Sequence, residues 1–253
     1  MNRLSYIILF CILFSSCASK KEIIYFQDAG NYASVTTTLK SVLIQPNDIL
    51  NIRIGALVPE TALPYNIQTG NAVGGSSMIE TLKVQGYLVT PEATIVLPIL
   101  GTINTAGLSV TALETQIKSE LEKGGHLVNP TVAVRILNAK VTVLGEVKAP
   151  GTYSFLEQSI SVPQALGYAG DLTINGKRND ILLIRESEGN RTITHIDLTT
   201  ANWMNNPEYQ IHQNDVLIVN PNNAKVKTAG FVGNASNILT IASLILSSLI
   251  LIN

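Results

Sequence analysis

The amino-acid sequence predicts an α+β fold in which small sheets each grasp one helix. Two internal echoes carry this prediction. An Asn-Asp phrase ahead of an apolar strand occurs at 44–52 and again at 211–219, and a Leu-Gly phrase followed by a glycine turn and a serine occurs at 100–109 and at 144–161. A chain of 253 residues is long enough for one large domain or for two smaller ones that each bury a core.

Charged residues are scarce and unevenly placed. They make up 14% of the chain, against roughly 25% in an ordinary soluble domain. None occurs in 4–17 or in 228–253. The net charge of −1 excludes a polybasic nucleic-acid binder, because neutralising phosphates requires clustered Lys and Arg. Two uncharged ends therefore flank a body of ordinary composition.

The first uncharged end predicts a signal peptide over residues 1–16. Arg3 supplies its positive start, 7–14 a hydrophobic stretch too short to cross a bilayer, and Ser15-Ser16 the small residues before Cys17. Together with the cysteine these residues resemble a bacterial lipobox, so we expect the cysteine to be acylated and to begin the mature chain. The alternative is a stray thiol in an ordinary secretory signal.

Residues 17–40 are expected to form a lipidated tether and an initial strand. Cleavage before Cys17 removes the other cysteine, Cys11. Only the acylated cysteine is then left, so the exported body is expected to fold without a disulfide. Because two or more acyl chains anchor a protein stably, membrane lipid is an expected partner.

The first unit, residues 41–137, has clear strand and helix signals. The Pro-Asn-Asp turn at 46–48 precedes an alternating apolar strand, because Pro presets the turn and Asn and Asp tolerate its geometry. Ser109 is expected to cap a helix over 110–122 that ends at Gly124-Gly125.

The second unit, residues 138–222, is richer in strands. Ser161 is expected to cap a short helix with Pro163 in its first turn and Gly170 at its end. Two strands follow, joined by a hairpin at 186–190. This order predicts a small sheet that grasps the helix.

Taken in order, these phrases resemble the bacterial outer-membrane polysaccharide export lipoproteins of the Wza type. The resemblance begins with Gln45–Leu50, where Asn47 replaces the family's glycine. The phrases that continue it are Leu97–Ile103, Ala106–Leu108, Asn129–Val134, Lys140–Tyr153, Ala165–Asp171 and Tyr209–Val219. It implies a polysaccharide export domain over 41–137, followed by a soluble-ligand-binding β-grasp (SLBB) domain over 138–222.

The resemblance also implies a function and a location. The protein is expected to be lipid-anchored at the outer membrane with its main body in the periplasm. It is expected to form a homo-oligomeric ring that conducts capsular polysaccharide or exopolysaccharide to the cell surface. An inner-membrane polysaccharide copolymerase or tyrosine kinase is the expected partner.

Two features depart from the family pattern. Residues 90–94 lack the Asp-x-x-Gly turn often seen before the first Leu-Pro strand, and one β-grasp unit is obvious where the longest relatives have two. In addition, the Gly-rich stretch Thr61–Met78 predicts a loop, either a surface excursion or a tolerated insertion.

The second uncharged end, residues 223–253, predicts a linker and a membrane-spanning helix. Residues 234–253 extend about 30 Å as a helix, which suffices for the thin bacterial outer membrane. The hydroxyl side chains recur at helical spacing and share one stripe: Ser236, Thr240, Ser243 and Ser247. Such a stripe suits a wet lumen or close contact between copies in a ring. The alternative is a simple membrane anchor.

The sequence contains no catalytic or metal-binding pattern. The histidines at 126, 195 and 212 are not spaced as metal ligands, and no nucleophile elbow or phosphate-binding glycine loop occurs. We therefore expect neither an enzyme nor a bound cofactor. Trp203 and Tyr209 are candidates for stacking on a sugar ring, although Trp203 is as well suited to filling the core of the second unit.

Two functions remain open at this point. One is the oligomeric conduit. The other is a monomeric lipoprotein that faces the periplasm and binds a glycan or a partner protein without forming a pore. The hydroxyl stripe distinguishes them, because a single helix surrounded by lipid has no need of it.

Overall fold

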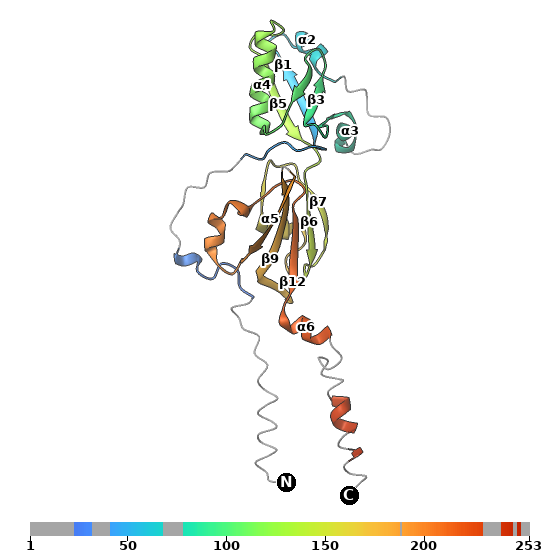
Figure 1. Cartoon of the computed structure of the whole chain (residues 1–253), viewed down its shortest axis with the longest axis vertical. Helices are drawn as coiled ribbons and strands as arrows, with labels where there is room; N and C mark the ends of the chain where they lie inside the picture. Colours follow the sequence, from blue (N-terminus) through green and yellow to red (C-terminus); the bar gives the residue numbers. More distant parts are fainter. Residues whose placement is uncertain are drawn as a thin grey trace.

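Figure 1 shows a computed structural model of the chain, which describes residues 23–31, 41–67, 78–187, 189–229, 239–244 and 247–248. Two domains lie one above the other, and each has its own hydrophobic core. The first domain ends at β5 (Thr131–Ile136) and the second begins at β6 (Lys140–Gly145), so the connection between them is short. The predicted mixture of helices and strands is confirmed.

The first domain is built on an antiparallel sheet in the order β2–β1–β5. The central strand β1 (Ile49–Gly55) follows the predicted Pro-Asn-Asp turn, and β2 (Tyr87–Leu88) is short. Helix α4 (Val110–Lys123) packs along β5 on one face of the sheet. A separate hairpin, β3 (Thr94–Leu97) with β4 (Gly101–Asn104), contributes further side chains to the same core.

Ser109 caps α4 as predicted. Its Oγ accepts a hydrogen bond from the backbone N–H of Ala112, 3.2 Å away. The helix ends at Gly124, and the next residue, Gly125, takes the left-handed conformation with a φ of 69°. Local side-chain chemistry therefore sets both ends of this helix.

The prediction of one long loop over 61–78 is wrong at its start. Pro59–Ala62 forms α2, and Leu63–Tyr65 forms the 3-10 helix η3. Each element has a proline in its first turn, where the fixed φ favours helical backbone. Helix α3 (Met78–Gln85) begins where the predicted loop ends. Residues 68–77 lie outside the described part of the chain.

The second domain is a five-stranded sheet in the order β10–β9–β12–β6–β7. Among these described strands β12 and β6 run parallel, and the other neighbours are antiparallel. The remaining strands have these bounds: β7 Gly151–Ser154, β9 Gly176–Ser187, β10 Asn190–Ile196 and β12 Val216–Pro221. The hairpin of β9 and β10 is the one that the sequence predicts.

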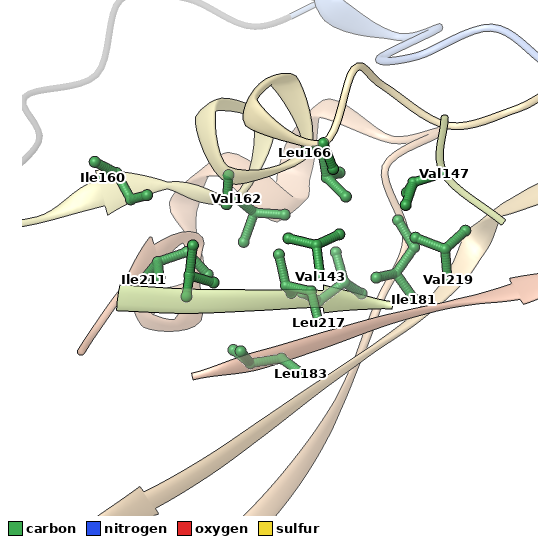
Figure 2. Close-up of a cluster of buried hydrophobic side chains, with 14 of the residues drawn as sticks. Val143, Val147, Ile160, Val162, Leu166, Ile181, Leu183, Ile211, Leu217 and Val219 are labelled. Carbon is green, nitrogen blue, oxygen red and sulfur yellow. The ribbon is translucent and has the colours of Figure 1, made fainter. Parts of the chain in front are cut away.

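Helix α5 (Val162–Tyr168) lies against one face of this sheet, so the predicted grasp is confirmed. Ser161 and Gln164 form a capping box at its start. Figure 2 shows the core, where Leu166 of the helix faces aliphatic strand residues such as Leu217. Smaller elements complete the domain: β8 (Ile160–Ser161), η4 (Ala201–Asn205), η5 (Pro207–Tyr209) and β11 (Gln210–Ile211).

Residues 23–31, which we name the N-terminal clip, lie on the second domain although they precede the first in sequence (Figure 1). The clip contains turns and η2 (Ala29–Asn31), so the initial strand expected in the tether does not occur in this described stretch. Three hydrogen bonds hold it: Phe26 N to Leu198 O at 3.0 Å, Gln27 N to Thr199 O at 2.8 Å and Ala201 N to Asp28 Oδ1 at 2.6 Å.

Helix α6 (Asn223–Ala229) follows the second domain. Farther along the chain, residues 239–244 and 247–248 are helical. Within the described ranges, no helix combines the length and apolar character needed to cross a membrane. The other residues of the predicted spanning helix lie outside those ranges.

Candidate functional site

The two Asn-Asp phrases fold into the same kind of turn. Asn47 and Asn214 both take the left-handed conformation, with φ of 70° and 66°. In the first turn, Asp48 Oδ2 accepts a hydrogen bond from the N–H three residues earlier at 2.8 Å, and Asp215 Oδ2 does the same in the second turn at 2.8 Å. The echo in the sequence is therefore a structural repeat.

These two turns meet at the junction of the domains. Gln213 in the second turn donates from Nε2 to Leu43 O at 2.8 Å and to Asp48 Oδ2 at 3.2 Å. Asp48 and Gln213 are 2% and 3% exposed. A buried amide and a buried carboxylate thus join the two domains.

The two aspartates differ in their charge partners. Asp215 receives two hydrogen bonds from Arg185, Nε to Oδ1 at 2.9 Å and Nη2 to Oδ2 at 2.7 Å. Arg185 also pairs with Glu208. Asp48 is bonded by neutral N–H groups instead, and burial raises the pKa of its carboxyl to about 6.

A cavity of about 300 Å³ lies beside this junction. Both domains contribute to its lining, which includes Val42, Ser109, Arg135, Ala139, Glu157 and Gln213. The lining mixes polar and apolar side chains, and a domain boundary is a common place for a small-molecule site.

The N-terminal clip has a second set of contacts. Tyr25 donates from its hydroxyl to Asp171 Oδ1 at 2.6 Å, and the Arg178 guanidinium carbon lies 5.1 Å from the centre of the Tyr25 ring. Burial, followed by the hydrogen bond to the carboxylate, raises the pKa of the Tyr25 hydroxyl. Sequence reasoning missed this contact; the aromatic pair Tyr25-Phe26 within a polar tether is the signal that indicates docking.

The predicted membrane-facing residues are only partly within the described chain. Cys17 and Ser236 lie outside it. Thr240 and Ser243 belong to the helical residues 239–244, where Ser243 Oγ donates to Thr240 O at 2.8 Å, and Ser247 belongs to 247–248. The acylation of the cysteine and the role of the hydroxyl stripe stay predictions.

The structure places Trp203 in the core of the second domain, with 7% of its surface exposed. Tyr209 packs against it, with 6.1 Å between the ring centroids. Trp203 thus occupies the core position given above as the alternative to a sugar contact, and contact of either ring with a sugar stays a prediction.

The histidines make separate local contacts. His195 Nδ1 lies 2.7 Å from Asp180 Oδ1, and His126 packs edge-on against Tyr65. Among the residues that the structure describes, no group of three or more His, Cys, Asp and Glu side chains is placed to hold a metal ion.

Two protein families match the two domains in order. Residues 37–137 match the family described as "Polysaccharide biosynthesis/export protein", and residues 140–197 match the SLBB domain. The matched stretches correspond to the domain with α4 and to α5 with four of the five strands of the sheet that grasps it.

Relatives of the chain are export proteins by description. The "EPS I polysaccharide export outer membrane protein EpsA" of Ralstonia solanacearum is 26% identical over 205 residues, which cover 78% of this chain and 52% of the relative. The protein of the same description in Ralstonia nicotianae is 32% identical over 151 residues, covering 56% of this chain and 38% of the relative. The chain thus spans about half or less of the relatives' length. With an export domain followed by an SLBB domain, the chain belongs to the Wza-type polysaccharide export proteins.

Proposed function

We propose that the protein is a subunit of an outer-membrane channel that exports capsular polysaccharide or exopolysaccharide. The observation that carries this proposal is the order of the two domains, matched from residue 37 to 197. The printed descriptions of the two Ralstonia relatives, as polysaccharide export outer membrane proteins, support the location and the substrate class. The body of the protein lies in the periplasm in this proposal.

The paths of the two chain ends support an orientation. Ile23 of the clip and Asn222–Ala224 at the start of α6 line one cavity, so the chain enters and leaves the second domain at the same place. Residues 18–22 separate Cys17 from the clip, and so few residues reach at most about 20 Å. The acylated cysteine therefore holds the second domain near the outer membrane, and the first domain projects into the periplasm.

The terminal helices of neighbouring copies form the passage through the membrane. Ser236, Thr240, Ser243 and Ser247 face the lumen or an adjacent helix, where small hydroxyl residues permit close approach. A hydrated polymer slides past such a surface without strong binding, so conduction is passive. An inner-membrane polysaccharide copolymerase or tyrosine kinase docks on the periplasmic end and couples synthesis to export.

The mass of the complex extracted in detergent tests this proposal. A mass several times that of the acylated subunit is expected, and a monomer with its lipid intact refutes the channel. Cys17→Ser, followed by labelling with radioactive palmitate, tests the anchor, because the variant is expected to lose all incorporated label.

The hydroxyl stripe is tested by Ser243→Leu with Ser247→Leu. We expect the double variant to lose the oligomer or the surface polysaccharide while the protein is still made and acylated. Ile241→Leu with Ile245→Leu, on the face opposite the stripe in the predicted helix, is the matched control and is expected to retain both. Unchanged oligomer and polysaccharide in the stripe variant would overturn the role of this face.

A monomeric glycan-binding lipoprotein is the second candidate, favoured by the cavity of about 300 Å³ between the domains. Leu156 lines this cavity and is 53% exposed, so Leu156→Trp is expected to fill it. If the wild-type protein is a monomer that binds the purified polysaccharide and the variant does not bind it, the second candidate holds. If it leaves an oligomer that still exports, the channel holds.

A further inference from the structure

We propose that copies of the chain join through the edges of the second domain's sheet, with β10 of one copy paired to β7 of the next. This inference rests on the proposed oligomeric channel and names the surface that assembles it. β10 and β7 are the outermost strands of the sheet, and no described strand pairs with the outer side of either.

The β10 edge has few of the devices that normally prevent pairing. Native edge strands are protected by charged side chains, especially lysine, or by proline, bulges or shortness. β10 is seven residues long, contains neither lysine nor proline, and runs Asn-Arg-Thr-Ile-Thr-His-Ile with several β-branched residues. Its single arginine, Arg191, pairs within the same hairpin with Glu186. An open edge of this kind is a template for pairing with a strand of another chain.

The hydrogen-bond alternation shows which backbone groups point outward. On the β7 side, Phe155 N donates to Ala139 O, so the groups of Thr152 and Ser154 face away from β6. On the other side, the hairpin of β9 and β10 closes at the hydrogen-bonded pair Ser187–Asn190. Hydrogen-bonded and non-bonded pairs alternate from there, so the backbone N–H and C=O groups of three residues face away from β9: Arg191, Ile193 and His195. Each edge therefore offers both donors and acceptors.

The strand directions make the two edges complementary. β9 is antiparallel to β10 and to β12, so β10 and β12 run the same way. β6 is parallel to β12 and antiparallel to β7, so β7 runs opposite to β10. Rotating one copy about an axis along the strands brings its β10 beside the next copy's β7 in antiparallel orientation. Such a contact uses two different edges and generates a ring where the rotation between copies closes.

A row of side chains on the outer face continues across this contact. The register places Ile193, Ile184 and Val216 side by side on neighbouring strands, followed by Thr142 and Thr152. Ile193, at the β10 end of the row, is 60% exposed in the single copy. Pairing it with Thr152 of the next copy extends the row and covers the isoleucine, and no like charges come face to face.

Two proline substitutions test the edges separately. Ile193→Pro and Ser154→Pro each remove an N–H that points outward, so the ladder inside the sheet is kept. Each variant is expected to run as a monomer in detergent where the wild type is a ring. Ile193→Val keeps the N–H and is expected to keep the ring. Thermal unfolding of the variants serves as the check on folding.

A mixture of the two variants provides the sharpest result. Each retains one sound edge, β7 in Ile193→Pro and β10 in Ser154→Pro, so an equimolar mixture is expected to form a heterodimer and nothing larger. If both variants keep the full ring, the edge contact is wrong although the channel stands. If the wild type itself is monomeric, the channel proposal fails instead.

Hydrogen exchange of the wild-type assembly gives a test that needs no variant. In an open edge the amides of Arg191, Ile193 and His195 exchange at least about tenfold faster than those of Thr192 and Thr194, which bond to β9. In the proposed ring both sets are protected. Fast exchange of the outward set in the intact oligomer overturns the pairing.

Discussion

Gln213 of the second domain donates a hydrogen bond to Asp48 of the first across 3.2 Å, and both side chains are almost fully buried. The two residues belong to equivalent turns, one from each copy of the repeated Asn-Asp phrase. The same amide also bonds Leu43 O. The domains are therefore joined by the meeting of two copies of one local structure.

Removing the amide is expected to weaken the junction. Gln213→Ala removes one of the two hydrogen bonds to the buried Asp48 carboxylate and the side-chain donor to the Leu43 carbonyl, at a cost of about 1–3 kcal/mol in the free energy of unfolding. Gln158→Ala, at an exposed position lining the same cavity, is the control and is expected to change stability by less than about 0.5 kcal/mol. Urea unfolding of both variants makes the comparison, and equal effects would argue against the contact.

The buried carboxylate predicts a pH dependence of stability. Burial raises the pKa of Asp48 from 3.8 to about 6, so the folded state holds the proton more tightly than the unfolded state. The contribution of this group is largest below about pH 4 and is lost as the pH rises through about 6, a change on the order of 3 kcal/mol. Asp48→Asn is expected to flatten this part of the profile. Parallel profiles for wild type and variant, from urea unfolding at several pH values, would contradict the assignment.

We expect a different result at Asp215, the equivalent aspartate of the second turn, because it is paired with Arg185. Arg185→Met leaves the Asp215 carboxylate buried without its partner and is expected to cost about 3–5 kcal/mol. Adding Asp215→Leu is expected to recover much of this loss, since the uncompensated charge is gone. Glu208→Gln, at a position 31% exposed, is the milder control. Calorimetric unfolding of the set measures the coupling, and simple additivity would refute it.

At Gly145 the neighbouring strand leaves no room for a side chain. Its φ is 88°, and a Cβ would lie 2.1 Å from the Val219 carbonyl oxygen on the neighbouring strand. Gly189 also has a positive φ, of 76°, but has open space around it. Gly189→Ala is expected to cost about 1–2 kcal/mol, and Gly145→Ala clearly more, because the strands must also separate. Thermal melts that rank the two variants the other way would show that the close approach is relieved elsewhere.

We expect the substitution Ala93→Gly to stabilise the protein. It takes a left-handed conformation with a φ of 55° in the turn that lacks the family's usual glycine. Ala93→Gly relieves this strain, and a gain of about 0.5–1 kcal/mol is expected. Asn47→Gly is the comparison, with a smaller expected change because asparagine tolerates this conformation. A lower melting temperature for Ala93→Gly would refute the argument.

Local signals account for what the sequence predicts well. The caps at Ser109 and Ser161 and the turns at Asn47 and Asn214 depend on hydrogen bonds within a few residues, so their phrases suffice to locate them. The short helices at 59–65 are not predicted from the sequence. The many Gly, Asn and Ser residues that follow them favour a loop, and the two prolines in the first helical turns are a weaker signal.

Long-range contacts account for what the sequence does not predict. Tyr25 and Asp171 are 146 residues apart, and neither carries a signal for the other. The pairing of Gln213 with Asp48 is equally remote, at 165 residues. The repeated phrase is visible in the sequence, but the meeting of its two copies depends on how the domains stack.

The path of the chain has a mechanical consequence. The clip binds the second domain before the chain visits the first, and the chain returns to the same place before α6, where Ile23 and Asn222 line one cavity. In the proposed arrangement, with a lipid at one end and a membrane helix at the other, tension between the two ends is carried by the second domain alone. The first domain lies outside this path, so a partner that pulls on it loads the buried junction at Gln213 as well as the second domain.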